Sequence, residues 1–107
     1  MTKQDKNLSV FCEGINDKNA MFGSLPSKKE RRSKNFYEMP LSENLILGTA
    51  IGSSILGEKV LVNFQRTEFS LLAIEQIINN AAKIPFMSNG RHKISLVLRM
   101  VILSQIF

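Results

Sequence analysis

Three short apolar runs alternate along this chain with two segments of helical length. The runs are rich in leucine, valine and isoleucine, which predicts strands at Leu8–Cys12, Val60–Phe64 and Ser95–Leu103. The intervening segments, Glu43–Leu56 and Glu68–Ile84, carry apolar residues at helical spacing. Strands joined by helices form β-α-β units, because parallel strands need a long crossover connection. The sequence therefore predicts an α/β fold, with a parallel sheet flanked by helices and strands buried on both faces.

Both predicted helices have recognisable start and stop signals. Ser42 is suited to cap the first helix, and Gly57 lies just past its end. Thr67 is predicted to cap the second helix. Pro85 is predicted to end it, because the residue before a proline is disfavoured in helical backbone angles. The residues Ser88-Asn89-Gly90 that follow predict a turn.

The connection between the first predicted strand and the first predicted helix is polar and holds a basic cluster. Residues 28–34 contain five lysines and arginines and one glutamate, which accounts for most of the chain's net charge of +5. Such a cluster binds nucleic acid in some proteins and is a solvated loop in more of them. No interleaved aromatic residues or zinc-ligand spacing accompany it, so we expect a loop, with one short helix at most, and no nucleic-acid partner.

Length and composition limit the other possibilities. The 107 residues suffice for one small domain, and the single cysteine, Cys12, excludes an internal disulfide. The polar start of the chain carries no apolar secretory signal, so we expect a cytoplasmic or otherwise intracellular protein. The apolar segments are shorter than the roughly 20 residues that a membrane span requires, so no membrane association is expected. In so short a helix, Gly48 and Gly52 indicate close packing rather than a membrane dimer motif.

Several motifs occur in the order and spacing of one enzyme family. The first predicted helix opens with Pro40-Leu41-Ser42-Glu43-Asn44, and the remaining motifs are Val10–Gly14, Met21–Gly23, Gly48–Gly52, Phe64–Phe69, Glu75–Lys83, Met87–Gly90 and Leu96–Arg99. Over residues 8–102 the chain resembles the beta subunit of the decarboxylating component of 2-oxo acid dehydrogenases. That subunit carries a transketolase-like pyrimidine-binding domain. The resemblance implies a partial thiamine-diphosphate-binding fold.

The resemblance also implies a role for Glu43. In this family a glutamate at that position hydrogen-bonds the cofactor's aminopyrimidine ring and promotes its imino tautomer. The family pocket further implies cofactor contacts from Leu41, Gln65 and Phe69, with Leu45 adding to an apolar lining. Without the resemblance, an acidic residue in the first turn of a helix is explained by the helix dipole alone.

Partners follow from the same resemblance. In the family, an alpha subunit holds the cofactor's diphosphate through magnesium, and a second beta chain completes the assembly. This sequence has no glycine-aspartate-glycine motif of the alpha type and no predicted metal ligands of its own. We therefore expect thiamine diphosphate to be shared with an alpha subunit, and no metal to be bound by this chain.

The family pattern stops at residue 102. The family continues with a glycine-rich loop containing a glutamine-histidine-serine motif, whereas residues 103–107 read Leu-Ser-Gln-Ile-Phe. His92, the only histidine, does not match that motif and is expected in a solvated turn. We therefore expect a fragment or frame-shifted product with an aberrant tail, inactive alone. Two other hypotheses remain: a structural or interaction remnant without activity, and a small basic nucleic-acid-binding protein.

Overall fold

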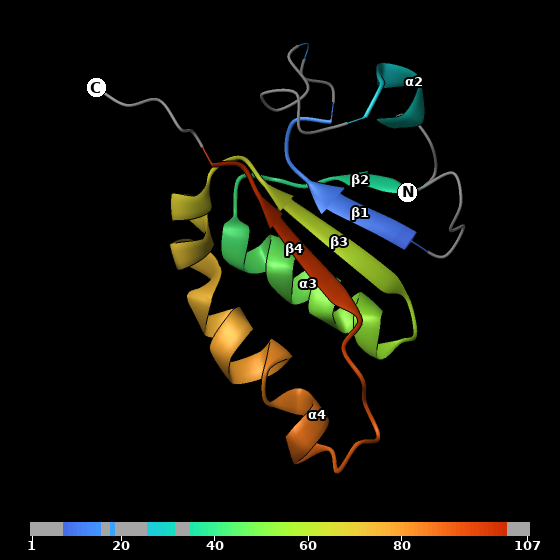
Figure 1. Ribbon diagram of the computed structural model, residues 1–107, viewed down its shortest axis with the longest axis vertical. Helices are drawn as coiled ribbons and strands as arrows, with labels where there is room; N and C mark the ends of the chain where they lie inside the picture. Colours follow the sequence, from blue (N-terminus) through green and yellow to red (C-terminus); the bar gives the residue numbers. More distant parts are fainter. Residues whose placement is uncertain (1–7, 16–17, 19–25, 32–34, 103–107) are drawn as a thin grey trace.

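A four-stranded parallel sheet forms the centre of the chain. The computed structural model describes residues 8–15, 18, 26–31 and 35–102. The strands are β1 (Leu8–Cys12), β2 (Phe36–Glu38), β3 (Lys59–Phe64) and β4 (Leu96–Met100), in the order β2-β1-β3-β4 (Figure 1). Every neighbouring pair is parallel. The predicted α/β fold is thus confirmed. The three predicted strands are present, but the third ends at Met100, short of the predicted end at Leu103, which lies outside the described residues.

The segment predicted as a connection contains more structure than expected. It includes the short helix α2 (Lys28–Arg31), which was anticipated, and the strand β2, which was not. β2 is only three residues long and pairs Val10 with Phe36 and Cys12 with Glu38. Phe11 and Tyr37 stack with ring centroids 5.1 Å apart, which holds β2 against β1. No apolar alternation marks so short a strand in the sequence.

Helix α3 (Glu43–Ile55) begins and ends close to the predicted positions. Ser42 occupies the N-cap position with extended backbone angles, but its side chain makes no capping hydrogen bond. Gly57 follows the helix with φ of +102°, a conformation that favours glycine, and its N–H donates to the carbonyl of Ser54 at 3.0 Å. The start of α3 is therefore set by backbone geometry and its end by glycine.

The second helical segment is not the single α-helix that the apolar spacing predicted. It consists of the 3-10 helix η1 (Thr67–Ala73), the π-helix η2 (Gln76–Ala81) and the short helix α4 (Ile84–Met87). The hydroxyl of Ser70 donates to the carbonyl of Thr67 at 2.7 Å, which favours the tighter first turn. The β-branched and amide side chains of residues 77–80 are weak helix formers. Pro85 lies in the first turn of α4 and does not end the helical segment, because proline is tolerated in a first helical turn.

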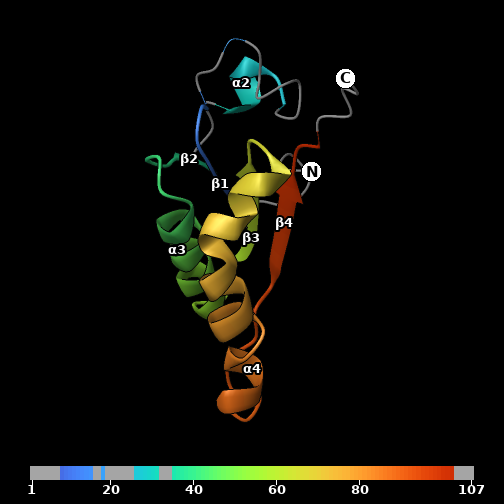
Figure 2. The ribbon, with the colours of Figure 1, turned by 90° about the vertical axis from the view of Figure 1, so that its left-hand side faces the viewer.

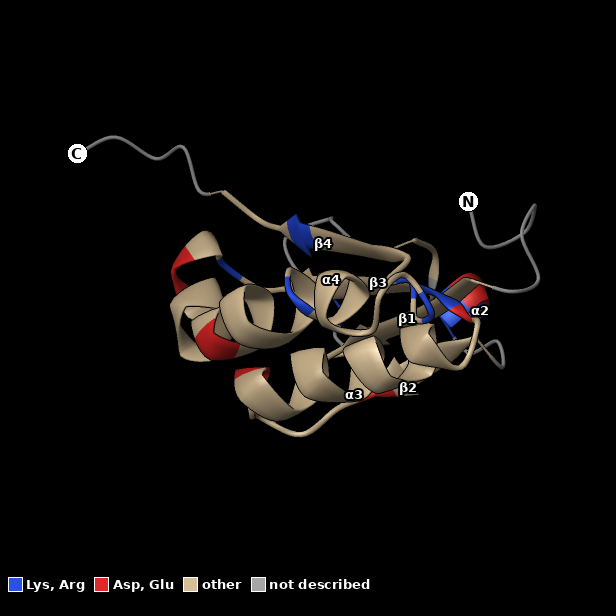
Figure 3. Ribbon diagram, turned by 90° about the horizontal axis from the view of Figure 1, so that it is seen from below, with Lys and Arg blue, Asp and Glu red and all other residues tan. Residues whose placement is uncertain are grey.

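Helix α3 and the helical segment 67–87 lie on one face of the sheet, whereas α2 lies apart from them (Figure 2). α3 and the 67–87 segment cover a buried cluster that includes Ile46, Leu47 and Val62, while Leu8, Val10 and Leu61 form a second cluster on the opposite face. β1 and β3 are almost fully buried, as parallel strands usually are. β4 differs from the prediction: its residues alternate between half-buried and exposed, because it lies along one margin of the sheet (Figures 2 and 3).

Candidate functional site

The strand order creates a topological switch point between β1 and β3. The chain passes from β1 outward to β2, and from β3 outward to β4 in the opposite direction. In open parallel sheets, ligands bind outside the carboxyl ends of the strands at such a point. Glu13 follows β1 there and Gln65 follows β3, while Glu43 opens α3 at the same edge (Figure 1).

Glu43 is largely buried, and no described side chain pairs with its carboxylate. Its exposed fraction is 6%, although it is the first residue of a helix. Among the described residues, its carboxylate makes no hydrogen bond or ion pair, and its resolved electrostatic neighbour is another carboxylate, Glu13. Such a carboxylate is a candidate for binding a ligand that supplies the missing donor.

Glu13 and Glu38 complete an acidic cluster with Glu43. Burial raises the pKa of Glu13 above its ordinary value, and the negative charges of Glu43 and Glu38 raise it further. Glu38 is held in place by the turn after β1, since its two carboxylate oxygens accept from the backbone N–H groups of Gly14 at 3.0 Å and Ile15 at 2.7 Å. Gly14 has φ of +71°, which lets both N–H groups face Glu38.

A buried arginine braces the same turn. The guanidinium of Arg31 is 5% exposed and donates to the carbonyl of Ile15 at 2.8 Å. Arg31 is one of the five basic residues in the 28–34 cluster, so one charge of that cluster is buried and bonded to the chain itself. The nucleic-acid hypothesis thereby loses one of the cations on which it depended, and Lys29 beside it is exposed.

The thiol of Cys12 also belongs to this edge. It is fully buried, and its pKa is raised to about 12, first by burial and then by the charge of Glu38, with Arg31 acting in the opposite direction. A thiol in this environment is unreactive. Within the described part of the chain, no group of three histidines, cysteines or acidic residues is arranged to hold a metal ion.

The predicted contact residues are placed unequally around this edge. Gln65 and Phe69 are half-buried, and η1, which carries Phe69, packs against α3. Leu41 and Leu45 are 80% and 50% exposed, so within this chain they do not enclose Glu43. The assignment of these four residues to a cofactor pocket stays a prediction.

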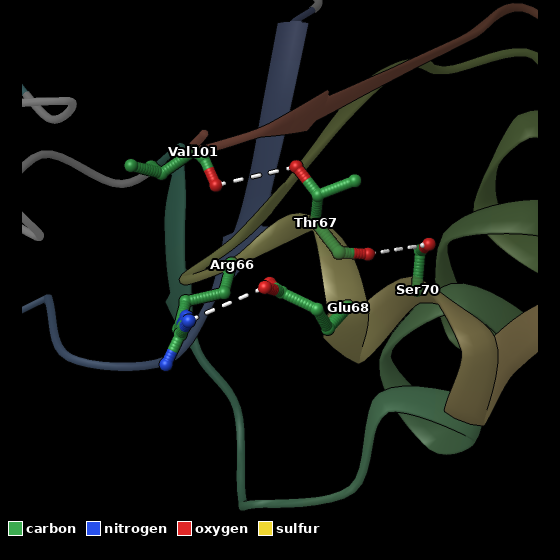
Figure 4. A network of polar contacts seen from close by, with 5 residues as sticks. All are labelled: Arg66, Thr67, Glu68, Ser70 and Val101. Carbon is green, nitrogen blue, oxygen red and sulfur yellow. Dashed lines mark hydrogen bonds and ion pairs between the residues drawn. The ribbon is translucent and has the colours of Figure 1, made fainter. Parts of the chain in front are cut away.

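A polar network fixes the entry into η1 beside these residues (Figure 4). The hydroxyl of Thr67 donates to the carbonyl of Val101 at 3.3 Å, and the backbone N–H of Thr67 donates to the same oxygen at 3.1 Å. The predicted helix cap from Thr67 is therefore wrong, because its side chain is directed to the end of β4 instead. Arg66 pairs with Glu68 at 3.2 Å on the exposed side.

A second network joins the start of α3 to η2. The amide nitrogen of Gln76 donates to Asn44 at 3.2 Å, and Asn80 donates to the amide oxygen of Gln76 at 2.6 Å. A Cβ atom on Gly48 would lie 3.3 Å from Gln76, so the glycine permits this approach, as its spacing predicted. A Cβ on Gly52 would meet nothing within 4 Å, and the close packing expected there is not observed within this chain.

Sequence reasoning identified Glu43 from the family motif but assigned no role to Glu13 or Glu38. Glu13 was visible as the residue that directly follows a predicted strand. Glu38 had no signal, because β2 itself was not predicted. His92 lies exposed beside the turn at residues 88–90, where Asn89 and Gly90 have positive φ, as expected.

Comparison with known proteins gives a consistent result. No protein-family model matches the chain. The beta subunit of the pyruvate dehydrogenase E1 component from Gracilaria tenuistipitata is 36% identical over 95 residues, covering 85% of this chain and 29% of the relative. The mitochondrial beta subunit from Bos taurus is 35% identical over 71 residues, covering 66% of this chain and 20% of the relative. The mitochondrial subunit from Saccharomyces cerevisiae is 37% identical over 62 residues, covering 58% and 17%.

The chain spans less than a third of the length of each of these relatives. In the described part of the chain, no helix has the length and apolar character needed to cross a bilayer. The motif-based resemblance is confirmed by these matches, and the chain is a relative of the beta subunits of the pyruvate dehydrogenase E1 component.

Proposed function

We propose that this chain holds the aminopyrimidine end of thiamine diphosphate as part of a 2-oxo acid dehydrogenase, with Glu43 as the activating carboxylate. The single observation that carries the proposal is the burial of Glu43 without a hydrogen-bond donor among the described residues. A protonated or N–H-bearing ring edge would supply that donor.

The surroundings of Glu43 support the assignment. The residue lies at the carboxyl edge of a parallel sheet, next to the switch point at which such folds bind ligands. Gln65 follows the adjoining strand β3 and offers a polar contact, and Phe69 offers an apolar one. The residues present therefore fit one end of a flat heteroaromatic ring, while the described residues offer no metal-binding cluster for a diphosphate.

In this proposal the chain positions the aminopyrimidine end of the cofactor and shares a proton with it. Thiamine diphosphate, when bound, supplies the carbanion chemistry that decarboxylates a 2-oxo acid. Glu43 would hold a proton at its carboxylate, facing the place that a ring nitrogen of the bound cofactor would take. The negative charge of Glu43 helps to raise the pKa of Glu13, after burial, so the two carboxylates lie close enough to interact. Magnesium and diphosphate are assigned to an alpha subunit, and Leu41 and Leu45, exposed here, are assigned to the face that meets a partner.

The test is reconstitution of a complete enzyme. The chain is co-expressed with an alpha subunit and with the remaining beta-subunit sequence of the yeast relative, and pyruvate decarboxylation is measured with thiamine diphosphate and magnesium. We expect turnover from the assembly and none from the chain alone. Glu43→Gln should lower the rate by about 10²- to 10⁴-fold, the usual contribution of a positioned acid or base.

A matched control separates chemistry from folding. Glu58 is exposed, precedes β3 at the opposite edge of the sheet and accepts from the hydroxyl of Ser9 at 3.0 Å. Glu58→Gln should leave the rate within about twofold. A Glu43→Gln assembly with near-normal turnover would return Glu43 to the role of a helix-dipole partner.

A further inference from the structure

The side chain of Gln76 bridges two elements of the fold. It comes from η2, which packs against α3 (Figure 2), and its amide nitrogen donates to Oδ1 of Asn44 at 3.2 Å. Its amide oxygen accepts from Nδ2 of Asn80 at 2.6 Å, four residues further along the same segment. Because the nitrogen and the oxygen of this amide both have partners, the direction of the Gln76 side chain is fixed.

Gly48 makes room for this bridge. Asn44 and Gly48 are four residues apart, so they lie on the same face of α3. A Cβ atom at position 48 would lie 3.3 Å from the amide nitrogen of Gln76. The Gln76 side chain therefore passes over the Gly48 backbone, where no side chain stands, to reach the first turn of α3.

The first turn of α3 has few attachments of its own. Ser42 stands at the N-cap without a side-chain capping bond, and Leu45 is 50% exposed. The N–H groups of a first turn lack intrahelical acceptors, so a turn without a capping side chain is less firmly held. Within the described part of the chain, the bond from Gln76 to Asn44 is the one side-chain hydrogen bond that joins this turn to another element. Glu43 lies in the same turn, directly before Asn44.

We propose, building on the role assigned to Glu43 above, that Gln76 is a positioning residue for that carboxylate. By holding Asn44, Gln76 fixes the turn from which Glu43 extends, and so sets where the carboxylate lies relative to a bound aminopyrimidine ring. A misplacement of about 1 Å at a reacting group can cost about 100-fold in rate, even when its cause lies elsewhere in the fold. The geometry of η2 agrees with such a role, since π-helical turns are rare and occur frequently at functional sites.

The same segment carries a second row of side-chain bonds that provides a control. Nδ2 of Asn79 donates to Glu75 at 3.4 Å, and Nζ of Lys83 donates to Asn79 at 3.2 Å. All three residues are exposed, and both bonds stay within the helical segment. Asn79→Ala therefore removes comparable local bonds and leaves the bond between Gln76 and Asn44 in place.

The experiment measures pyruvate decarboxylation by the reconstituted assembly. Gln76→Ala and Asn44→Ala should each lower kcat about tenfold, and the KM for pyruvate should change less than about twofold. The double variant should lose no more than either single variant, because both remove the same bond. Asn79→Ala should keep kcat within about twofold. In the Glu43→Gln background, Gln76→Ala should cause no further loss, whereas a merely structural role would lower the rate in both backgrounds.

Hydrogen exchange in the chain alone gives a readout that does not depend on turnover. The N–H of Ile46 donates to the carbonyl of Ser42 at 2.9 Å and closes the first turn of α3. Gln76→Ala should speed the exchange of this N–H several-fold, and Asn79→Ala should leave it unchanged.

The outcomes separate the role of Gln76 from that of Glu43. Unchanged exchange in Gln76→Ala, a near-normal kcat, or equal losses of kcat in both backgrounds would overturn the positioning role. Near-normal turnover of Glu43→Gln would instead overturn the role of Glu43, and the exchange of the Ile46 N–H would still decide whether Gln76 holds the turn.

Discussion

The carboxylate of Glu13 makes the folded chain sensitive to pH. Its raised pKa means that the folded state binds this proton more tightly than the unfolded state, whose ordinary value is 4.5. The contribution of this group to stability is therefore full below pH 4.5 and is lost as the pH rises through the raised folded pKa. Glu13→Gln should match wild type in melting temperature near pH 4 and exceed it at pH 7.

The control for this prediction is Glu75→Gln, at an exposed residue of the second helical segment whose Oε1 accepts from Asn79 at 3.4 Å. That substitution removes a carboxylate outside the acidic cluster, so it measures the effect of a Glu-to-Gln change in itself. A Glu13→Gln variant whose advantage does not grow between pH 4 and pH 7 would show that Glu13 is not held in an unfavourable charged state.

The thiol of Cys12 gives a direct measure of how tightly this edge is closed. With its pKa raised to about 12 from 9.0, very little thiolate exists at pH 8 in the folded chain. Alkylation by iodoacetamide should be more than about 100-fold slower in buffer than in 8 M urea, followed by mass spectrometry. Because the chain has one cysteine, the signal is unambiguous. Fast alkylation in buffer would mean that the edge opens readily.

At the scale of elements, one side chain ties helix α3 to the start of β4. Ser54 is 3% exposed, and its hydroxyl oxygen accepts from the backbone N–H of Ser95 at 2.6 Å. Ser54→Ala leaves that N–H without its acceptor, which should lower the free energy of unfolding by about 1–3 kcal/mol. The control is Ser53→Ala on the same helix. It removes a half-buried hydroxyl that forms no side-chain hydrogen bond with described residues.

The comparison of the two serine variants removes the helix propensity of alanine from the result, since both gain it equally. Urea unfolding followed by circular dichroism gives both values. If Ser54→Ala is no less stable than Ser53→Ala, the link between α3 and β4 contributes nothing, and β4 is held by its pairing with β3 alone.

The elements differ in how far the sequence could predict them, and the reason is physical. β1, β3 and α3 were predictable because burial imposes continuous apolar runs and helical spacing. The 67–87 segment kept helical spacing but not α-helical geometry, since local bonds such as the one from Ser70 to Thr67 select the turn type. β2 depends on the tertiary contact between Phe11 and Tyr37, which no local pattern records.

The same distinction applies to the candidate site. Glu43 was predictable because it lies in a motif at a helix start. Its closeness to Glu13 was not, because that depends on the order of the strands. The exposure of Leu41 and Leu45 was not predictable, because both are apolar and precede or begin a helix that is largely buried. Local sequence thus locates the residues of the edge, and strand order brings them together.

At the scale of the whole molecule, the two faces and two margins of the sheet are unequal. Helices cover one face, and the margin formed by β2 is three residues long, with Glu38 bonded to the turn after β1. The margin formed by β4 is longer, with five residues, of which only Arg99 is charged. No described element covers it. A further strand would therefore extend the described sheet more readily at β4 than at β2, because β4 offers the longer row of backbone groups.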